Sequence, residues 1–124
     1  MPKNKKIMIV EDEPFTLKMY THLLTEEGFE VTATPNTKEV VRLAKANKPD
    51  LFIVDMMLQD GDGFDVIREL RKTTEFKKTP ILVLSNLGQE MDINEAKKVG
   101  ADKYLVKSNV RFEEVIKTVQ AMLK

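Results

Sequence analysis

Residues 51–54 read Leu-Phe-Ile-Val, an apolar run that ends at an acidic residue, Asp55. Two further runs have the same character, Ile-Met-Ile-Val at residues 7–10 and Ile-Leu-Val-Leu at residues 81–84. A strand with one face in water alternates apolar and polar side chains, whereas a strand covered on both faces is apolar throughout. The three runs therefore predict the central strands of a parallel sheet.

Between the strands, apolar residues recur at the spacing of one helix face. The five predicted faces are Phe15, Met19, His22 and Leu23; Val40, Val41, Leu43 and Ala44; Phe64, Ile67 and Leu70; Met91, Ile93, Ala96 and Val99; and Val115, Ile116, Val119, Met122 and Leu123. Pro14 suits the first turn of the first helix, which Gly28 closes, and Gly100 ends the fourth. Asn36 or Thr37 could cap the second helix.

Two shorter runs, at residues 31–33 and 104–106, complete a set of five strands that alternate with the five helices. Strict alternation predicts an open α/β sheet wound on both sides. Connections between parallel strands are right-handed, which leaves few topologies, and we expect the flavodoxin-like strand order 2-1-3-4-5. The length of 124 residues suits one such core and is too short for two, so residues 1–124 are expected to form a single domain.

The composition excludes several classes of function. Lys and Arg together number 20, as do Asp and Glu, so no net charge favours nucleic acid or an anionic membrane. The absence of cysteine excludes a disulfide framework, a thiolate zinc site and a cysteine nucleophile. The apolar runs are far shorter than the roughly 20 residues that span a bilayer, and none has the form of a signal-peptide core. We therefore expect a cytoplasmic protein that binds neither nucleic acid directly nor membranes.

Residues with reactive side chains stand just after four of the expected strands. Glu11 and Asp12 follow the first strand, Asp55 the third, Ser85 the fourth and Lys107 the fifth. The carboxyl ends of parallel strands lie at one edge of the sheet, where ligands bind in folds of this class. Taken singly, each residue has a structural explanation, because acids after a strand often cap the next helix. Their agreement across four strand ends predicts a shared site.

The residue types at this edge indicate metal-assisted phosphoryl transfer. Converging carboxylates raise one another's pKa unless a cation neutralises them, and oxygen-only ligands favour Mg²⁺ or Mn²⁺. Beside a metal ion and the Lys107 ammonium, Asp55 would stay ionised and could attack phosphorus to form an aspartyl phosphate. The metal, the ammonium and the Ser85 hydroxyl would share the charge on the phosphoryl oxygens.

Four blocks of sequence stand in order along nearly the whole chain. They read Ile-Met-Ile-Val-Glu-Asp-Glu-Pro at residues 7–14, Leu-Phe-Ile-Val-Asp-Met-Met-Leu at 51–58 followed by Asp-Gly-Asp-Gly-Phe at 60–64, Pro-Ile-Leu-Val-Leu-Ser at 80–85, and Gly-Ala-Asp-Lys-Tyr-Leu-Val-Lys at 100–107. Through these blocks the chain resembles the receiver domains of two-component response regulators, including single-domain chemotaxis regulators. The resemblance implies a phosphorylation-dependent signalling switch that catalyses only its own phosphorylation and dephosphorylation.

The resemblance also implies a role for each residue of the expected site. Asp55 is then the phosphoacceptor and Lys107 the phosphate-binding lysine. Mg²⁺ is bound by Asp12 directly, by Glu11 directly or through water, by Asp55, and by the backbone carbonyl of Met57. The phosphoryl group comes from a histidine kinase or phosphotransfer protein, or from a small acyl phosphate.

Two further residues match the switch positions of the family. Ser85 takes the place of the switch hydroxyl, and Tyr104 that of the aromatic residue whose ring changes position on activation. Their movement is expected to change the surface formed by the fourth helix, fifth strand and fifth helix. That surface is expected to control a downstream protein target.

Four residues depart from the usual pattern of the family. Glu11 stands where Asp is more frequent, Gln59 replaces a frequent Pro, and Asn86 takes a place usually held by a small residue. Ser108 replaces the Pro that usually follows the lysine. We therefore predict a trans peptide bond between Lys107 and Ser108, because a cis bond before a non-proline residue costs ~2.5 to 4 kcal/mol.

Three alternatives fit parts of the pattern. A phosphatase of the haloacid-dehalogenase type also forms an aspartyl phosphate, but it needs a second Asp two positions after the nucleophile, where this chain has Met57. A flavodoxin-like nucleotide or flavin binder needs a Gly-rich loop after the first strand, where Glu11, Asp12 and Glu13 would repel phosphate. The third alternative is an interaction module with the receiver fold that is never phosphorylated. The intact set of acids, hydroxyl and lysine argues against it, because such a module does not need these residues.

Overall fold

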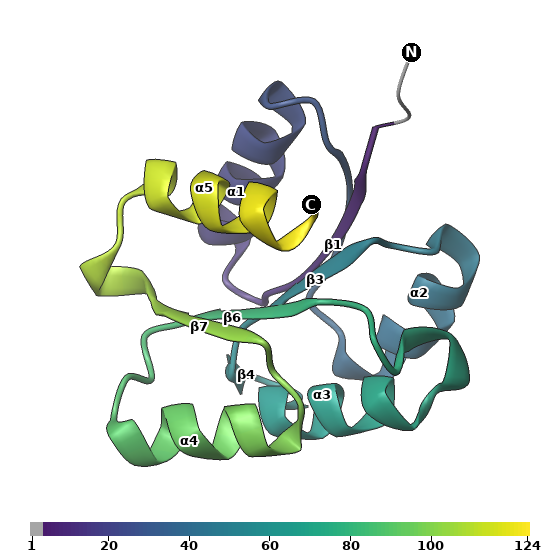
Figure 1. The fold of residues 1–124 in the computed structure, drawn as a ribbon, viewed down its shortest axis with the longest axis vertical. Coiled ribbons are helices and arrows are strands. Elements are labelled where there is room, and N and C mark those ends of the chain that lie inside the picture. Colours follow the sequence, from purple (N-terminus) through teal and green to yellow (C-terminus); the bar gives the residue numbers. More distant parts are fainter. Residues whose placement is uncertain (1–3) are drawn as a thin grey trace.

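The computed structural model describes residues 4–124; residues 1–3, which we assigned to the same domain, lie outside the described residues. Within this range a parallel sheet of five strands has the order β2-β1-β3-β6-β7 (Figure 1). Its strands are β1 (Lys6–Val10), β2 (Glu30–Thr34), β3 (Leu51–Val54), β6 (Ile81–Ser85) and β7 (Lys103–Val106). The flavodoxin-like order is confirmed, since β6 and β7 are the fourth and fifth strands of this sheet along the chain.

Helices cover both faces of the sheet. The α-helices in residues 4–124 are α1 (Pro14–Glu26), α2 (Val40–Asn47), α3 (Gly63–Lys72), α4 (Glu90–Val99) and α5 (Phe112–Met122), with short 3₁₀ turns η1 (Thr37–Glu39), η2 (Thr74–Phe76) and η3 (Lys107–Asn109). Figure 1 shows α1 and α5 on one face and α2, α3 and α4 on the other. Across the described residues, we find no helix with the length and apolar character that a membrane crossing demands.

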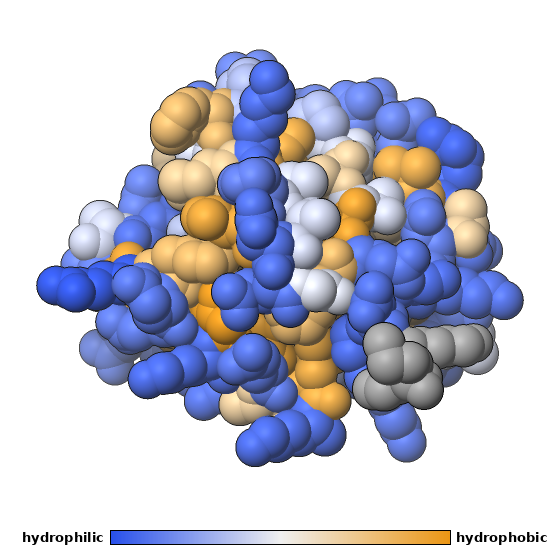
Figure 2. All heavy atoms as spheres, turned by 90° about the horizontal axis from the view of Figure 1, so that it is seen from above, coloured by the Kyte–Doolittle hydropathy of each residue, from blue (hydrophilic) through white to orange (hydrophobic). Residues whose placement is uncertain are grey.

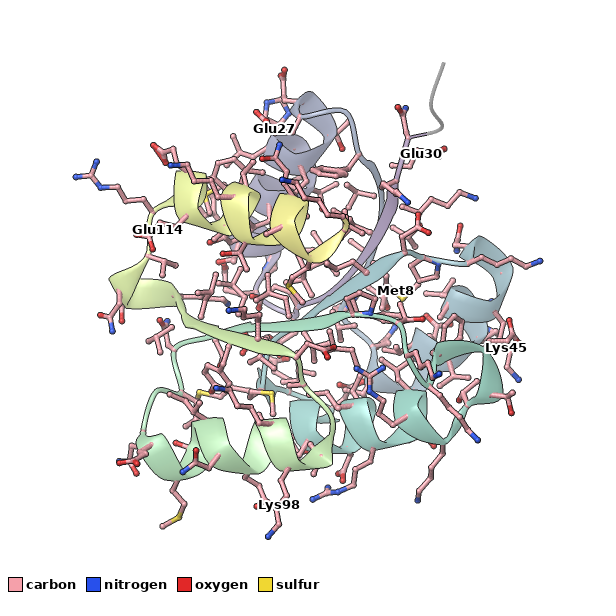
Figure 3. All side chains as sticks on the ribbon, viewed as in Figure 1. Met8, Glu27, Glu30, Lys45, Lys98 and Glu114 are labelled. Carbon is pink, nitrogen blue, oxygen red and sulfur yellow. The ribbon has the colours of Figure 1, made fainter. Side chains whose placement is uncertain are left out.

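Neighbouring residues of β1 point to opposite layers of the core. Ile7 and Ile9 are buried on the side of α1 and α5, where they share a cluster with Leu24. Met8 and Val10 are buried on the side of α2 and α3. Side chains fill the space between the sheet and both helix layers (Figure 3). The central strands are apolar throughout because both of their faces are covered.

The face of α1 that meets the core differs from our prediction. Phe15 and Met19 are 72% and 37% exposed, and His22 is also at the surface, whereas Tyr20 and Leu24 are buried. Apolar residues follow helical spacing on two sides of this helix. Periodicity alone therefore could not identify the buried side, and our prediction of that side was wrong. Seen from above the layer of α1 and α5, the surface is largely hydrophilic, with apolar side chains exposed between charged ones (Figure 2).

A small antiparallel hairpin directly after β3 was not predicted. It pairs β4 (Met57–Leu58) with β5 (Gly61–Asp62), so that Met57 lies opposite Asp62. Strands of two residues are too short to show a hydrophobic period. The hairpin fixes the path of the chain immediately after Asp55.

Most helix ends fall at the predicted residues. Gly28 and Gly100, just beyond α1 and α4, have φ angles of 97° and 129°, which favour glycine. The predicted cap of α2 is wrong, because η1 intervenes and the Asn36 side chain donates to Glu39 instead. No cis peptide bond occurs in the described range, so the peptide bond that precedes Ser108 is trans as predicted.

Candidate functional site

The carboxyl ends of three strands bring two acids and a lysine into contact. Nζ of Lys107, which follows β7, lies 3.0 Å from Oδ2 of Asp55, which follows β3. The same ammonium group donates a hydrogen bond to Oε1 of Glu11, which follows β1. The three side chains are largely buried, with exposed fractions of 16% for Lys107, 9% for Asp55 and 5% for Glu11. The sheet edge therefore gathers these three residues in a largely buried position.

Burial and ion pairing act in opposite directions on these groups. Burial raises the pKa of the Glu11 carboxyl above its usual value, and the hydrogen bond from Lys107 only partly offsets this effect. Burial also lowers the pKa of Lys107, but the hydrogen bonds to Glu11 and Asp55 outweigh it and leave that pKa raised. Lys107 is therefore positively charged at neutral pH, and it partly neutralises two carboxylates at once.

Backbone amides bind the other oxygens of the two buried acids. Oδ1 of Asp55 accepts the N–H of Met57 at 3.1 Å, and Oε2 of Glu11 accepts the N–H of Glu13 at 3.1 Å. The Glu13 side chain is exposed and caps α1, where it accepts the N–H of Thr16 at 2.7 Å. Glu13 is therefore a helix cap, and Glu11 is the acid after β1 that contacts Lys107.

Asp12 does not join the Lys107 cluster. Its Oδ2 accepts the backbone N–H of Gln59, in the turn between β4 and β5, at 2.5 Å. Among the side chains of residues 4–124, no three of the acid, His or Cys type form a group that could hold a metal ion. Glu11 and Asp55 therefore contact the same lysine, whereas the Asp12 carboxylate contacts the backbone of the neighbouring hairpin of β4 and β5.

Ser85 and Tyr104 meet at a shared backbone residue. Ser85 is fully buried at the end of β6, and its Oγ accepts the N–H of Leu87 at 3.3 Å. The Tyr104 hydroxyl, on the adjacent strand β7, donates to the carbonyl of the same Leu87. Burial and nearby Asp92 raise the pKa of Tyr104 above its usual value. Both predicted switch residues therefore contact the backbone of Leu87, an arrangement that no sequence pattern had indicated.

Comparison with known proteins identifies the family. Residues 7–120 match the family model described as the response regulator receiver domain. The chain belongs to this family. The receiver domain is 33% identical over 118 residues to protein PilH of Pseudomonas aeruginosa, which covers 95% of this chain and 97% of PilH. It is 40% identical over 119 residues to the transcriptional regulatory protein CusR of Escherichia coli, but it spans only 51% of that longer protein.

Solved structures agree with this assignment. The receiver domain superimposes on chemotaxis protein CheY4 of Vibrio cholerae with a TM-score of 0.91 and 30% identity, covering 97% of this chain and 99% of the other. The receiver domain of sensor histidine kinase PA1611 from Pseudomonas aeruginosa, solved with a magnesium ion coordinated in its active-site cleft, gives a TM-score of 0.87 at 25% identity, covering 97% and 98% of the two chains. The predicted resemblance is thus confirmed at the level of family and fold.

Proposed function

We propose that this receiver domain is a phosphorylation-dependent switch of a two-component system that accepts a phosphoryl group on Asp55. The observation that carries the proposal is the buried contact between Asp55 and Lys107 at the carboxyl end of the central strand. A largely buried carboxylate that contacts an ammonium group is suited to attack phosphorus.

The proposed reaction transfers a phosphoryl group without further chemistry. A carboxylate oxygen of Asp55 forms a bond to phosphorus as the bond between phosphorus and the donor breaks, and the donor leaves with the bonding electrons. The donor is a histidine kinase, a phosphotransfer protein or a small acyl phosphate. Lys107 then shifts from the carboxylate toward the new phosphoryl oxygens, whose charge it offsets. Ser85 lies at the end of the adjacent strand β6, and in this proposal its hydroxyl donates to the phosphoryl group.

The donor atoms at the site fit Mg²⁺. Mg²⁺ prefers oxygen ligands, usually takes one or two carboxylates and keeps water in its remaining positions, so it does not need a preformed group of three acids. Asp12 and Asp55, with Glu11 through water or directly and the backbone carbonyl of Met57, offer such a set. Bound there, Mg²⁺ would help to neutralise the phosphoryl oxygens. The magnesium ion in the related PA1611 receiver domain supports this assignment.

A phosphatase of the haloacid-dehalogenase type remains disfavoured. Its general acid would have to stand at Met57, whose side chain is 59% exposed and carries no ionisable group. We therefore assign no activity beyond phosphorylation and dephosphorylation of the domain itself. We further propose that the domain acts in the cytoplasm and controls a protein partner through the surface of α4, β7 and α5.

Acetyl phosphate labelling tests the proposed function. The chain should gain one phosphoryl group in the presence of Mg²⁺ and acetyl phosphate, as measured by intact-protein mass spectrometry. The Asp55→Asn variant keeps the shape of the side chain but lacks the nucleophilic carboxylate, so it should gain none. Omission of Mg²⁺ should greatly slow the labelling of the parent chain. Equal labelling of the parent and the variant would overturn the assignment of Asp55.

A further inference from the structure

The peptide group between Met56 and Met57 is hydrogen bonded at both ends. Its N–H belongs to Met57 and donates to Oδ1 of Asp55 at 3.1 Å. Its carbonyl belongs to Met56 and accepts the N–H of Gly63 at 3.1 Å. Gly63 is the first residue of α3, where the N–H groups of a helix have no intrahelical partner. One peptide group therefore connects the first turn of α3 to the carboxylate of Asp55.

The close approach of α3 leaves no room for a side chain at position 63. Gly63 is buried, and a Cβ atom added to it would lie 2.5 Å from the carbonyl oxygen of Asp55 and 2.7 Å from Cα of Met56. Both are backbone atoms, which cannot rotate away as the end of a flexible side chain can. Among the described glycines only Gly28 and Gly100 have a positive φ, so space and not backbone conformation requires glycine at position 63.

We propose that Gly63 is a positioning residue, whose lack of a side chain allows α3 to orient the Met57 N–H toward the carboxylate of Asp55. The inference rests on the proposed function, in which Asp55 attacks phosphorus. Met57 donates to one oxygen of this carboxylate, and Lys107 contacts the other at 3.0 Å, so two donors from different segments fix its orientation. Displacement of a reacting group by about 1 Å can lower a rate by roughly 100-fold.

Alanine at two nearby glycines separates this role from a general effect on the fold. Gly63→Ala forces the backbone of Asp55 and Met56 to move, so the rate of labelling by acetyl phosphate at saturating Mg²⁺ should fall about tenfold. Gly61→Ala is the matched control, because its Cβ would first meet the side chain of Thr37, at 3.1 Å. Its rate should remain within about twofold of the parent rate. Equal rates of the two variants would overturn the inference.

Nuclear magnetic resonance gives a readout that a loss of stability alone would not change. In the folded Gly63→Ala variant the Met57 amide resonance should move, because its bond to Asp55 is distorted, whereas Gly61→Ala should change it much less. In the unmodified chain, a coupling between the Gly63 nitrogen and the Met56 carbonyl carbon should be detectable across their hydrogen bond. Absence of this coupling would overturn the inference even if Gly63→Ala does not fold.

The outcomes for the parent chain separate this inference from the proposed function. A parent chain that is labelled at Asp55, together with a Gly63→Ala variant that is labelled equally fast, would overturn only the role of Gly63. A parent chain that acetyl phosphate does not label would overturn the proposed function and this inference with it.

Discussion

At the scale of single residues, Lys107 governs the electrostatics of the site. Its ammonium group contacts both Asp55 and Glu11, so one cation serves two buried carboxylates. From the sequence we predicted that a metal ion would neutralise the converging acids, which repel one another, and that Lys107 would also lie beside Asp55. The structure shows that a shared lysine supplies much of the same charge. Glu11 carries one methylene more than the usual Asp, and this added reach is consistent with its contact to Lys107.

The two tyrosines allow a prediction of how the stability of the fold depends on pH. Burial raises the pKa of both Tyr20 and Tyr104 above the ordinary value of about 10. Each side chain therefore holds its proton more tightly in the folded protein than in the unfolded one. The resulting contribution to stability is complete below the unfolded pKa and is lost as the pH rises through the folded pKa.

Near-ultraviolet absorbance of tyrosinate measures this directly. The native protein should titrate at a higher pH than the same protein in denaturant. The Tyr104→Phe variant should lose about half of the absorbance change, since the chain has only 2 tyrosines. A native titration curve that coincides with the denatured one would show that the environments of Tyr20 and Tyr104 do not disfavour the charged form.

Contacts between side chains and loop backbone groups could not be predicted from the sequence, and they share one physical reason. Side chains that follow parallel strands converge by a general rule, and that rule located the acids and the lysine. The bonds from Gln59 to Asp12 and from Tyr104 to Leu87 instead use backbone groups of loops. The path of a loop depends on turn geometry and leaves no periodic signal. The roles of the site residues stay predictions until they are tested chemically.

At the scale of helices and strands, Arg71 of α3 ties together segments that lie apart in the sequence. Its guanidinium group donates to the carbonyls of Phe76 and Thr79, before β6, and to the carbonyl of Gly100, after α4. It also donates to the Asp102 carboxylate at 2.9 Å. The side chain is only 18% exposed, so these bonds are partly shielded from water.

Replacement of Arg71 should therefore destabilise the fold. Arg71→Ala leaves several acceptors without their donor, and the free energy of unfolding should fall by about 2 to 4 kcal/mol. Arg71→Lys should recover only part of the lost free energy of unfolding, because an ammonium group cannot donate several hydrogen bonds in the planar geometry of a guanidinium group. Urea denaturation followed by circular dichroism measures both values.

A neighbouring arginine provides the control for this prediction. Arg68 is on the same helix but is 44% exposed and pairs with Asp65 and Glu95 at the surface. Because exposed ion pairs contribute little, Arg68→Ala should change the free energy of unfolding by about 0.5 kcal/mol or less. Similar losses for the two alanine variants would show that the buried contacts of Arg71 are not what stabilises this region.

The element-scale errors of the sequence analysis have physical causes. The order of the sheet could be predicted because long apolar strands and right-handed crossovers leave few alternatives. The buried face of α1 could not be predicted, because Phe15 with Met19 and Tyr20 with Leu24 both follow helical spacing. Only contacts with other elements decide between such faces, as when Tyr20 packs 5.9 Å from the ring of Phe112 on α5.

At the scale of the whole molecule, the loop that follows β6 contacts both Ser85, at the end of β6, and Tyr104, on β7. Ser85 and Tyr104 both bind Leu87, so a hydroxyl that turns toward a phosphoryl group would alter the contact that holds the Tyr104 ring. A few charge-assisted hydrogen bonds supply roughly 2 to 4 kcal/mol. The inactive state should be favoured by no more than this amount, because a ligand shifts an equilibrium only by its differential contacts.

Amide resonances with and without a beryllofluoride mimic of the phosphoryl group test this coupling. The account predicts shifts from Ser85 to Gly88 and around Tyr104, in addition to those next to Asp55. Tyr104→Phe removes the hydroxyl that binds Leu87 and should reduce the shifts on β7 while leaving those near Asp55. Shifts confined to the neighbours of Asp55 would describe a phosphate-binding domain that does not switch.

The central claim is that Asp55 itself receives the phosphoryl group, and the most direct test identifies the phosphorylated residue chemically. Borohydride reduces an acyl phosphate to an alcohol, which converts phosphoaspartate into homoserine and phosphoglutamate into a longer hydroxy amino acid. After reaction with acetyl phosphate and Mg²⁺, reduction and tandem mass spectrometry of the peptides should find homoserine at position 55. Reduction at Asp12 or Glu11, with Asp55 unchanged, would contradict the account.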